Sequence, residues 1–112
     1  MRNMSFSITT TQMYQRSKTV TRRMGWSFLQ PDDLVSAIEK GQGLKKGEKV
    51  KRIGTIKIIS IRAETLSSIT IEEVIKEGFP DMNVPQFVRM FCKANKCEPN
   101  DLVNRIEFER ID

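Results

Sequence analysis

The residues best suited to chemistry gather in one short stretch of the chain. We call this stretch the basic segment, and it reads Lys18-Thr19-Val20-Thr21-Arg22-Arg23. Its cations can hold phosphates, and an arginine guanidinium can also pair with a base edge or a carboxylate. β-Branched residues in its middle favour an extended chain whose side chains alternate in direction. Lys18 and Thr21 would then face opposite sides, and a twist is needed to bring them to one cavity. A solvated basic edge strand is the alternative.

Glu77 is the second candidate for chemistry. It falls at the predicted end of a helix, directly before Gly78-Phe79-Pro80. A carboxylate there opposes the negative end of the helix dipole, so the position is mildly unfavourable. A residue placed against local preference can serve function or a salt bridge. An ordinary surface glutamate is the alternative.

The chain has no histidine and only two cysteines, Cys92 and Cys97. This composition excludes Ser-His and Cys-His nucleophile pairs, His-ligated zinc and imidazole acid–base catalysis. Any catalysis must use Lys, Glu, Asp, Thr, Ser, Tyr or Cys. Cys92 falls in an apolar helical pattern and is predicted to be core, whereas Cys97 is predicted to be an inert surface residue, and both should be free thiols. We expect no metal and no cofactor.

Strands and helices that could position these residues can be read from the spacing of apolar residues. Alternation predicts strands over residues 5–9, 50–63 and 103–111, while residues 34–39 fit either a strand or a helix. Gly54 is a candidate bulge or barrel bend.

Three helices are predicted. The first is short, capped by Thr10 or Thr11 and running through Arg16, and the second covers residues 71–76 behind a Thr70–Glu73 capping box. The third follows Asn83 and buries Phe87 and Phe91. Strands with helices inserted between them, without βαβα repetition, predict one α+β domain over residues 1–112.

The charge of the chain favours an anionic partner. Lys and Arg number 19 against 14 Asp and Glu, for a net charge of +5. An excess of this size suits nucleic acid, although solubility alone also explains it. Residues 41–49, with three glycines and three lysines, are predicted to form a mobile basic loop. No apolar run has the length of a membrane span or a signal peptide, so a cytoplasmic protein is expected. Trp26 is predicted to be a core or lid residue.

The ordered motifs resemble those of ASCH domains. The basic segment is similar to the family's K-T-x-T-x-R signature, and residues 77–82 and 87–92 are similar to its E-G-F-P-x-M and F-V-x-x-F-C patterns. Residues 103–108 resemble its last barrel strand. The resemblance spans residues 5–111, and many short proteins of this kind resemble phage or prophage products. It implies a compact PUA-like β-barrel with flanking short helices and a cleft that faces RNA.

The resemblance also implies a site. One branch of the family hydrolyses N4-acetylcytidine to cytidine and acetate with a Lys, a Thr and a Glu, which correspond by motif position to Lys18, Thr21 and Glu77. A lysine with a lowered pKa would take a proton from the threonine or from water, and the glutamate would pass it to the leaving amino group. Arg23 matches the arginine of the signature and would serve structure, substrate orientation or the oxyanion.

Three functions follow as alternatives. A binding module would hold RNA or a modified nucleoside in the cleft, where phosphates are contacted by a set of basic residues: Arg22, Arg23, Lys45, Lys46, Lys49, Lys51 and Arg52. A small amidohydrolase would act on acylated cytidine, with a ribonuclease as a weaker variant. A protein-binding domain would use neither. We expect a monomer without membrane contact, and a salt bridge from Glu77 to Lys18 or Arg23 under both of the first two functions.

Overall fold

The computed structural model describes all residues, 1–112, and its secondary structure is α+β as predicted. In chain order the elements are β1 (Asn3–Ser5), α1 (Thr10–Tyr14), β2 (Val20–Arg23), β3 (Leu34–Ile38), β4 (Arg52–Thr65), a 3-10 turn (Leu66–Ser68), α2 (Ile71–Lys76), α3 (Val84–Asn95) and β5 (Leu102–Arg110). The strands form one mixed sheet in the order β1-β3-β4-β5-β2. β1 runs parallel to β3, and the other neighbours are antiparallel.

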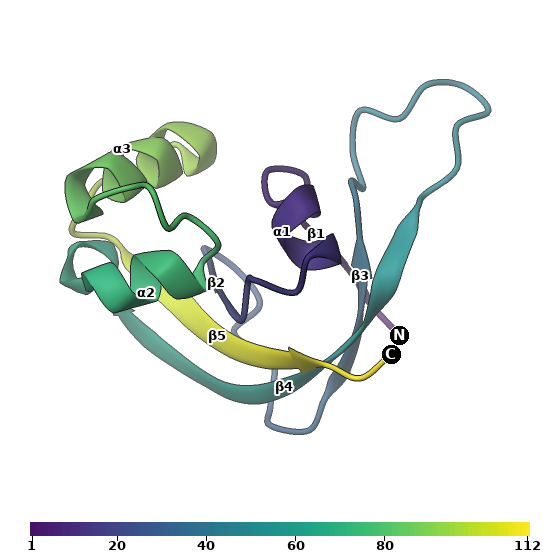
Figure 1. Ribbon diagram of the computed structural model, residues 1–112, viewed down its shortest axis with the longest axis horizontal. Helices are drawn as coiled ribbons and strands as arrows, with labels where there is room; N and C mark the ends of the chain where they lie inside the picture. Colours follow the sequence, from purple (N-terminus) through teal and green to yellow (C-terminus); the bar gives the residue numbers. More distant parts are fainter.

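The sheet is strongly curved, and the helices gather on its concave side (Figure 1). The long strands β4 and β5 run together along the bottom of the curve in this view, with α2 and α3 at one end. The loop between β3 and β4 projects at the other end, and α1 lies between this loop and the two helices α2 and α3. The register of β4 shifts against β5 between Ile58 and Ser60, and such bulges increase the bend of a strand.

No strand ladder joins β1 to β2, so strand pairing does not close the barrel that the family resemblance implies. The two edges are linked instead through a side chain, because Arg23 Nη2 donates a hydrogen bond of 2.7 Å to the Ser5 carbonyl oxygen. The structure therefore supports the α+β class and a cupped sheet.

The signals for α2 and α3 act as predicted, whereas α1 is preceded by Thr9, whose side chain makes no capping hydrogen bond, and ends at Tyr14 instead of Arg16. The Thr70 side chain accepts a hydrogen bond from the Glu73 amide. Asn83 and Gln86 form a reciprocal capping box, and both hydrogen bonds of this box are 2.8 Å long. Residues 34–38 form a strand, which resolves the ambiguity there. The strand predicted over residues 5–9 is wrong, because β1 ends at Ser5 and the next residues turn into α1. Gly54 lies opposite Ala37, where the register of β3 shifts.

Two apolar clusters hold the fold together. The larger lies on the sheet and is built from Met4, Phe6, Met13, Leu29, Val35, Ala37, Ile53, Ile56, Ile58, Ile106 and Phe108. The smaller joins α2 and α3 to the start of β5 and contains Leu66, Ile69, Val74, Phe87, Phe91 and Val103. Phe87 and Phe91 are buried, as the helical spacing predicts. The cleft described below lies where the two clusters meet the basic segment.

Candidate functional site

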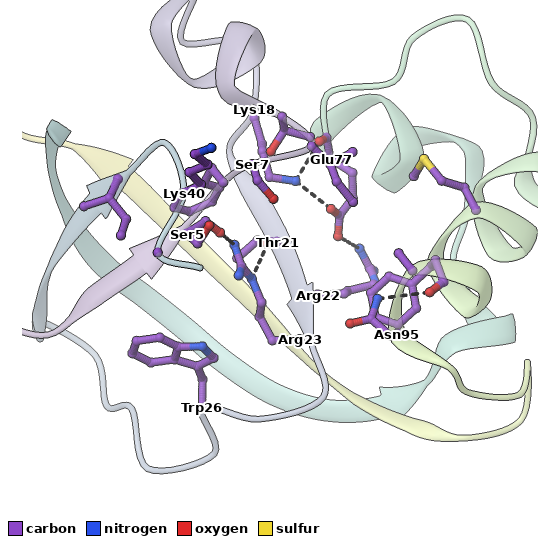
Figure 2. A pocket seen from close by; sticks show the side chains of 18 of the residues that line it. Ser5, Ser7, Lys18, Thr21, Arg22, Arg23, Trp26, Lys40, Glu77 and Asn95 are labelled. Carbon is purple, nitrogen blue, oxygen red and sulfur yellow. Dashed lines mark hydrogen bonds and ion pairs between the residues drawn. The ribbon is translucent and has the colours of Figure 1, made fainter. Parts of the chain in front are cut away.

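An open cleft of about 820 Å³ is bordered by the basic segment, β1 and the turn that follows it, the ends of the β3–β4 loop, and α3. Lys18, Thr21, Arg23 and Glu77 all line it, so the structure brings together the residues that the sequence analysis singled out. Figure 2 shows Lys18 and Glu77 meeting on one side of the cleft, with Thr21 and Arg23 beside them. Lys18 precedes β2, so it does not follow the alternation of that strand. It lines the same cavity as Thr21.

Glu77 is the centre of a buried ion cluster. Its Oε1 lies 2.8 Å from Lys18 Nζ and its Oε2 lies 3.2 Å from Arg22 Nη1. Lys18 Nζ also donates to the Glu77 backbone carbonyl oxygen, at 2.7 Å. Only 4% of the Lys18 and Glu77 side chains is exposed. The predicted ion pair with Lys18 is thus confirmed, and the second cation on Glu77 is Arg22 rather than Arg23.

Gly78 determines where Glu77 lies. α2 ends at Lys76, and Gly78 turns the chain with a φ of +104°, a conformation that favours glycine. The Gln12 side chain packs against this glycine and donates a hydrogen bond to its carbonyl oxygen. The turn leaves the Glu77 side chain buried beneath the cleft instead of in solvent.

Burial lowers the pKa of Lys18 below its usual 10.5, an effect that the nearby Arg23 and Arg22 increase and that Glu77 partly offsets. The hydrogen bonds of Lys18 specify what its nitrogen can do. A neutral amine has two N–H groups and one lone pair, and both N–H groups have acceptors on Glu77. The lone pair would then be free to accept a proton, whereas a charged Lys18 would have one N–H left to donate.

Thr21 and Arg23 form a second pair on the opposite face of β2, as the alternation predicts. Arg23 Nε donates a hydrogen bond of 3.1 Å to Thr21 Oγ1, so the hydroxyl proton of Thr21 is free for another acceptor. The Arg23 guanidinium lies over the Phe6 ring, 4.8 Å from its centroid. Burial lowers the pKa of Arg23 to about 10, which leaves the side chain cationic at neutral pH.

Arg22 differs from the predicted nucleic-acid contact. Its side chain is 1% exposed, and its guanidinium is held by Glu64, Glu73 and Glu77 at 2.7, 2.9 and 3.2 Å. A side chain so enclosed has no free surface for a phosphate, and we therefore assign Arg22 to the support of Glu77.

Glu73 and Arg105 complete this support, and the sequence analysis missed both in that role. Arg105 Nε lies 2.7 Å from Glu73 Oε1, and the hydrogen bond from Arg105 is the main reason that the pKa of Glu73 falls to about 2. The partners are 32 residues apart in sequence. No local pattern marks such a pair, and Glu73 already had an explanation in the capping box.

The predicted loop contacts divide into two groups. Lys45, Lys46, Lys49 and Lys51 are exposed, and the loop that carries them borders the cleft through Gly41, Gln42 and Val50. Arg52 instead contacts Ser36, Thr55 and Asp112. The four lysines are therefore accessible on a loop whose two ends border the cleft, whereas Arg52 is paired with Asp112.

The remaining sequence candidates lie outside the ion cluster. Trp26 is half-buried and lines the cleft, and Cys92 and Cys97 lie with their sulfurs 3.8 Å apart, away from it. Desolvation raises the pKa of the Cys97 thiol to about 11, which disfavours its reactive thiolate. No group of three or more His, Cys, Asp or Glu side chains is arranged to hold a metal ion. None of the helices has the length and apolar character to cross a membrane.

Comparisons with known proteins establish the fold. No family model and no curated protein matches the sequence. Among solved structures, an ASCH domain from Lactobacillus crispatus JV V101 is similar over 97% of this chain and 79% of that one, with a TM-score of 0.65 at 11% identity. Protein EF3133 from Enterococcus faecalis V583, assigned to DUF984, is similar over 90% of this chain and 66% of that one, with a TM-score of 0.62 and 13% identity.

The hypothetical protein PH0355 is similar over 97% of both chains, with a TM-score of 0.60 at 18% identity. Structural similarity at sequence identities as low as these supports a shared fold and does not indicate an activity. The fold that the motifs suggested, that of an ASCH domain, is therefore confirmed.

Proposed function

We propose that the cleft binds a nucleobase, carried by RNA or by a modified nucleoside. The observation that carries this proposal is the buried Lys18–Glu77 ion pair at the wall of an open cavity. Burying two charges lowers the stability of a small domain unless the charges are well paired. Buried groups in a cleft whose pKa is shifted are candidates for function.

The chemistry of this pair suits a base edge. Charged Lys18 has one N–H left to donate, because its other two bonds go to Glu77. Each Glu77 carboxylate oxygen accepts one hydrogen bond, from Lys18 or from Arg22, and can accept a second one. A donor beside an acceptor matches a base that presents an amino group next to a ring nitrogen or a carbonyl, such as cytosine. Thr21, which lines the same cleft, adds a hydroxyl proton.

The neighbouring charge supports RNA as the carrier of the base. The segment from residue 39 to residue 52 contains five lysines and one arginine against two glutamates. Phosphate contacts from such a segment supply affinity without reading the base.

Binding can be tested by titrating the protein with cytidine, N4-acetylcytidine and a short single-stranded RNA in a calorimeter. Lys18→Met should lose affinity for all three ligands, whereas Lys40→Met, which removes an exposed lysine from the rim of the same cleft, should retain most of it. If the wild-type protein binds none of the three, the proposal is wrong and a protein partner becomes the better hypothesis.

Hydrolysis of N4-acetylcytidine is the second candidate function. The observation that favours it is that a neutral Lys18, with both N–H groups bonded to Glu77, would keep a free lone pair. Neutral Lys18 would accept a proton from the Thr21 hydroxyl or from a water as that oxygen attacks the acetyl carbonyl carbon. The proton would pass through Glu77 to the exocyclic nitrogen as the C–N bond breaks, releasing cytidine. If water is the nucleophile, acetate leaves directly; if Thr21 is the nucleophile, one water then hydrolyses the acetyl ester on Thr21 and releases acetate.

Chromatography decides this second candidate. The protein is incubated with N4-acetylcytidine, and cytidine is measured over time. General-base catalysis contributes about 100- to 10,000-fold, so Lys18→Ala should lower the rate by at least that lower figure while Lys40→Ala keeps it. Absence of cytidine at high protein concentration would exclude this substrate and leave the cleft as a binding site.

A further inference from the structure

A second hollow of about 620 Å³ opens beside the cleft. The two share part of their lining: Asn3, Arg23, Trp26 and Asn95. Figure 2 shows Trp26 next to Arg23 at the edge of the cleft. A ligand held at Lys18 and Glu77 that is longer than one nucleoside can therefore extend past Arg23 into this second hollow.

The second hollow contains an aromatic pair with a cation over it. The rings of Trp26 and Phe28 lie 5.5 Å apart, and the Arg2 guanidinium carbon lies 4.5 Å from the centroid of the Phe28 ring. Trp26 is half-buried and packs against the larger core cluster, so it is fixed in place. Phe28 is 53% exposed. We call Arg2, Trp26 and Phe28 the aromatic shelf.

The backbone beneath the shelf is held in an unusual conformation. Trp26 has a φ of +72°, which large L-residues seldom adopt. The Asn104 side chain donates a hydrogen bond of 2.7 Å to the Gly25 carbonyl oxygen, and the Leu29 amide donates one to the Trp26 carbonyl oxygen. Strained backbone that the surrounding structure fixes in this way clusters at functional sites. Packing accounts for Trp26 in part, but it does not account for the exposed ring of Phe28.

We propose that the aromatic shelf stacks the base adjacent to the one in the cleft, so that the ligand is single-stranded RNA of two or more nucleotides. This inference rests on the proposed function. Aromatic faces stack on any base, and arginine adds a cation–π contribution. A base in a duplex is already stacked and paired, so the shelf requires a single strand.

Arg23 lies between the two sites and suits the phosphate that links the two nucleotides. Its Nε and Nη2 are engaged by Thr21 and Ser5, while Nη1 makes no hydrogen bond within the protein. A phosphate oxygen there would accept from a guanidinium that the protein already orients. The shelf, Arg23 and the cleft thus place an aromatic surface, a cation and a polar pocket next to one another in that order.

The experiment uses Trp26 as its own reporter, because it is the only tryptophan. Cytidine monophosphate and the trinucleotide CCC of RNA are titrated into wild-type protein, Phe28→Leu and Tyr14→Leu while its emission is recorded. Phe28→Leu keeps an apolar side chain but removes the stacking face. Tyr14 is a matched control, since it is 51% exposed and lines neither hollow.

The expected result is a loss of affinity confined to one ligand. Stacking on one aromatic ring is sufficient for a loss of about fivefold or more. Phe28→Leu should weaken the trinucleotide by at least that factor and leave the monophosphate unchanged, and Tyr14→Leu should change neither. If Phe28→Leu binds the trinucleotide as tightly as wild type does, or weakens both ligands equally, the shelf inference is wrong while the cleft proposal stands. If the wild-type protein binds neither ligand, both are wrong.

Discussion

Lys18 is a charged side chain that the fold buries almost completely next to an open cavity. Its ammonium has lost its water and received two oxygens of a single residue, Glu77, in exchange. Desolvation exceeds the compensation from the carboxylate, and the pKa of Lys18 falls as a result. The same feature has a measurable effect on stability, independent of any ligand.

The stability of the protein should depend on alkaline pH through Lys18. The unfolded chain holds the Lys18 proton with a pKa near 10.5 and the folded protein holds it less tightly. The unfolding free energy should therefore rise with pH as Lys18 deprotonates in the folded protein, and should level off above about 10.5. Urea unfolding of wild type and Lys18→Met between pH 7 and pH 10.5 measures this difference. Lys40→Met should follow wild type, and parallel curves for Lys18→Met and wild type would contradict the prediction.

At this scale the sequence predicted residue types, faces and the ion pair between Lys18 and Glu77, but not the partners of Arg22. The alternation correctly placed Thr21 and Arg23 on one face of β2 and Arg22 on the other, while Lys18, which precedes the strand, meets Arg22 at Glu77. It could not predict that Arg22 would be enclosed by three carboxylates, because those lie 42 to 55 residues further along the chain. A basic residue in an extended segment looks the same in sequence whether it faces solvent or a buried glutamate.

α2 is the element that assembles the ion cluster. It is only six residues long, yet Glu73 in its first turn reaches Arg22 on β2 and Arg105 on β5. Glu77 at its other end reaches Lys18 and Arg22. The helix thus connects the basic segment to β5 through side chains at both of its ends. We therefore expect a substitution at either end to alter the positions of the side chains that line the cleft.

Glu73→Gln tests the first of these ends. Hydrogen bonds to charged groups contribute about 1.5–3 kcal/mol, and we expect a loss of that size at pH 7. The pKa of Glu73 lies at about 2 in the fold against 4.5 ordinarily, so its contribution is complete above 4.5 and is lost as pH falls toward 2. The variant should therefore lose less stability than wild type across that interval in thermal melts. Glu72→Gln, on the same helix and without an ion pair, should change stability by less than about 0.5 kcal/mol. Identical acid profiles for Glu73→Gln and wild type would count against the cluster.

Gly78→Ala tests the other end. A methyl group at Gly78 would lie 2.9 Å from Gln12 Cγ, and its φ of +104° is unfavourable for alanine. We expect a loss of about 1–3 kcal/mol together with weaker ligand binding, because Glu77 moves with the turn. Gly25→Ala is the matched control, since nothing lies within 4 Å of its new methyl group. Equal chemical-denaturation midpoints for the two variants would show that the turn at Gly78 is not constrained.

The elements themselves were largely predictable, and the errors have physical causes. Capping residues correctly predicted where α2 and α3 begin, because Thr70 and Asn83 satisfy the first free amides of their helices. The strand predicted over residues 5–9 failed because Phe6 continues the alternation while the chain is already turning toward α1. Closure of the barrel could not be judged, since it depends on how two short edge strands meet in space.

On the scale of the whole molecule, positive charge and ligand surface coincide. The cleft and the second hollow share part of their lining, and the β3–β4 loop, which carries exposed lysines, borders the cleft at its two ends and projects from the rest of the fold (Figure 1). An RNA strand could contact all three at once. This arrangement predicts a binding constant with a strong dependence on salt.

The dependence on salt can be assigned to the loop. The triple variant Lys45→Ala, Lys46→Ala, Lys49→Ala should lower the slope of log K against log salt for single-stranded RNA by about 2, since each lost phosphate contact contributes about 0.7. A control triple at Lys57, Lys76 and Lys93, exposed or half-exposed lysines that line neither hollow, removes the same charge and should alter the slope much less. Equal slopes for the two triples would mean that only net charge matters.

The hydrogen bond from Arg23 to Ser5 joins two strands that each have a neighbour on one side only. Unpaired strand edges are templates for strands of other molecules, and a charged side chain across them hinders such pairing. We therefore expect Arg23 to hinder self-association through these two edges as well as to shape the cleft. Replacing it to change ligand preference would leave both edges open to other copies, and aggregation would then be mistaken for a loss of binding.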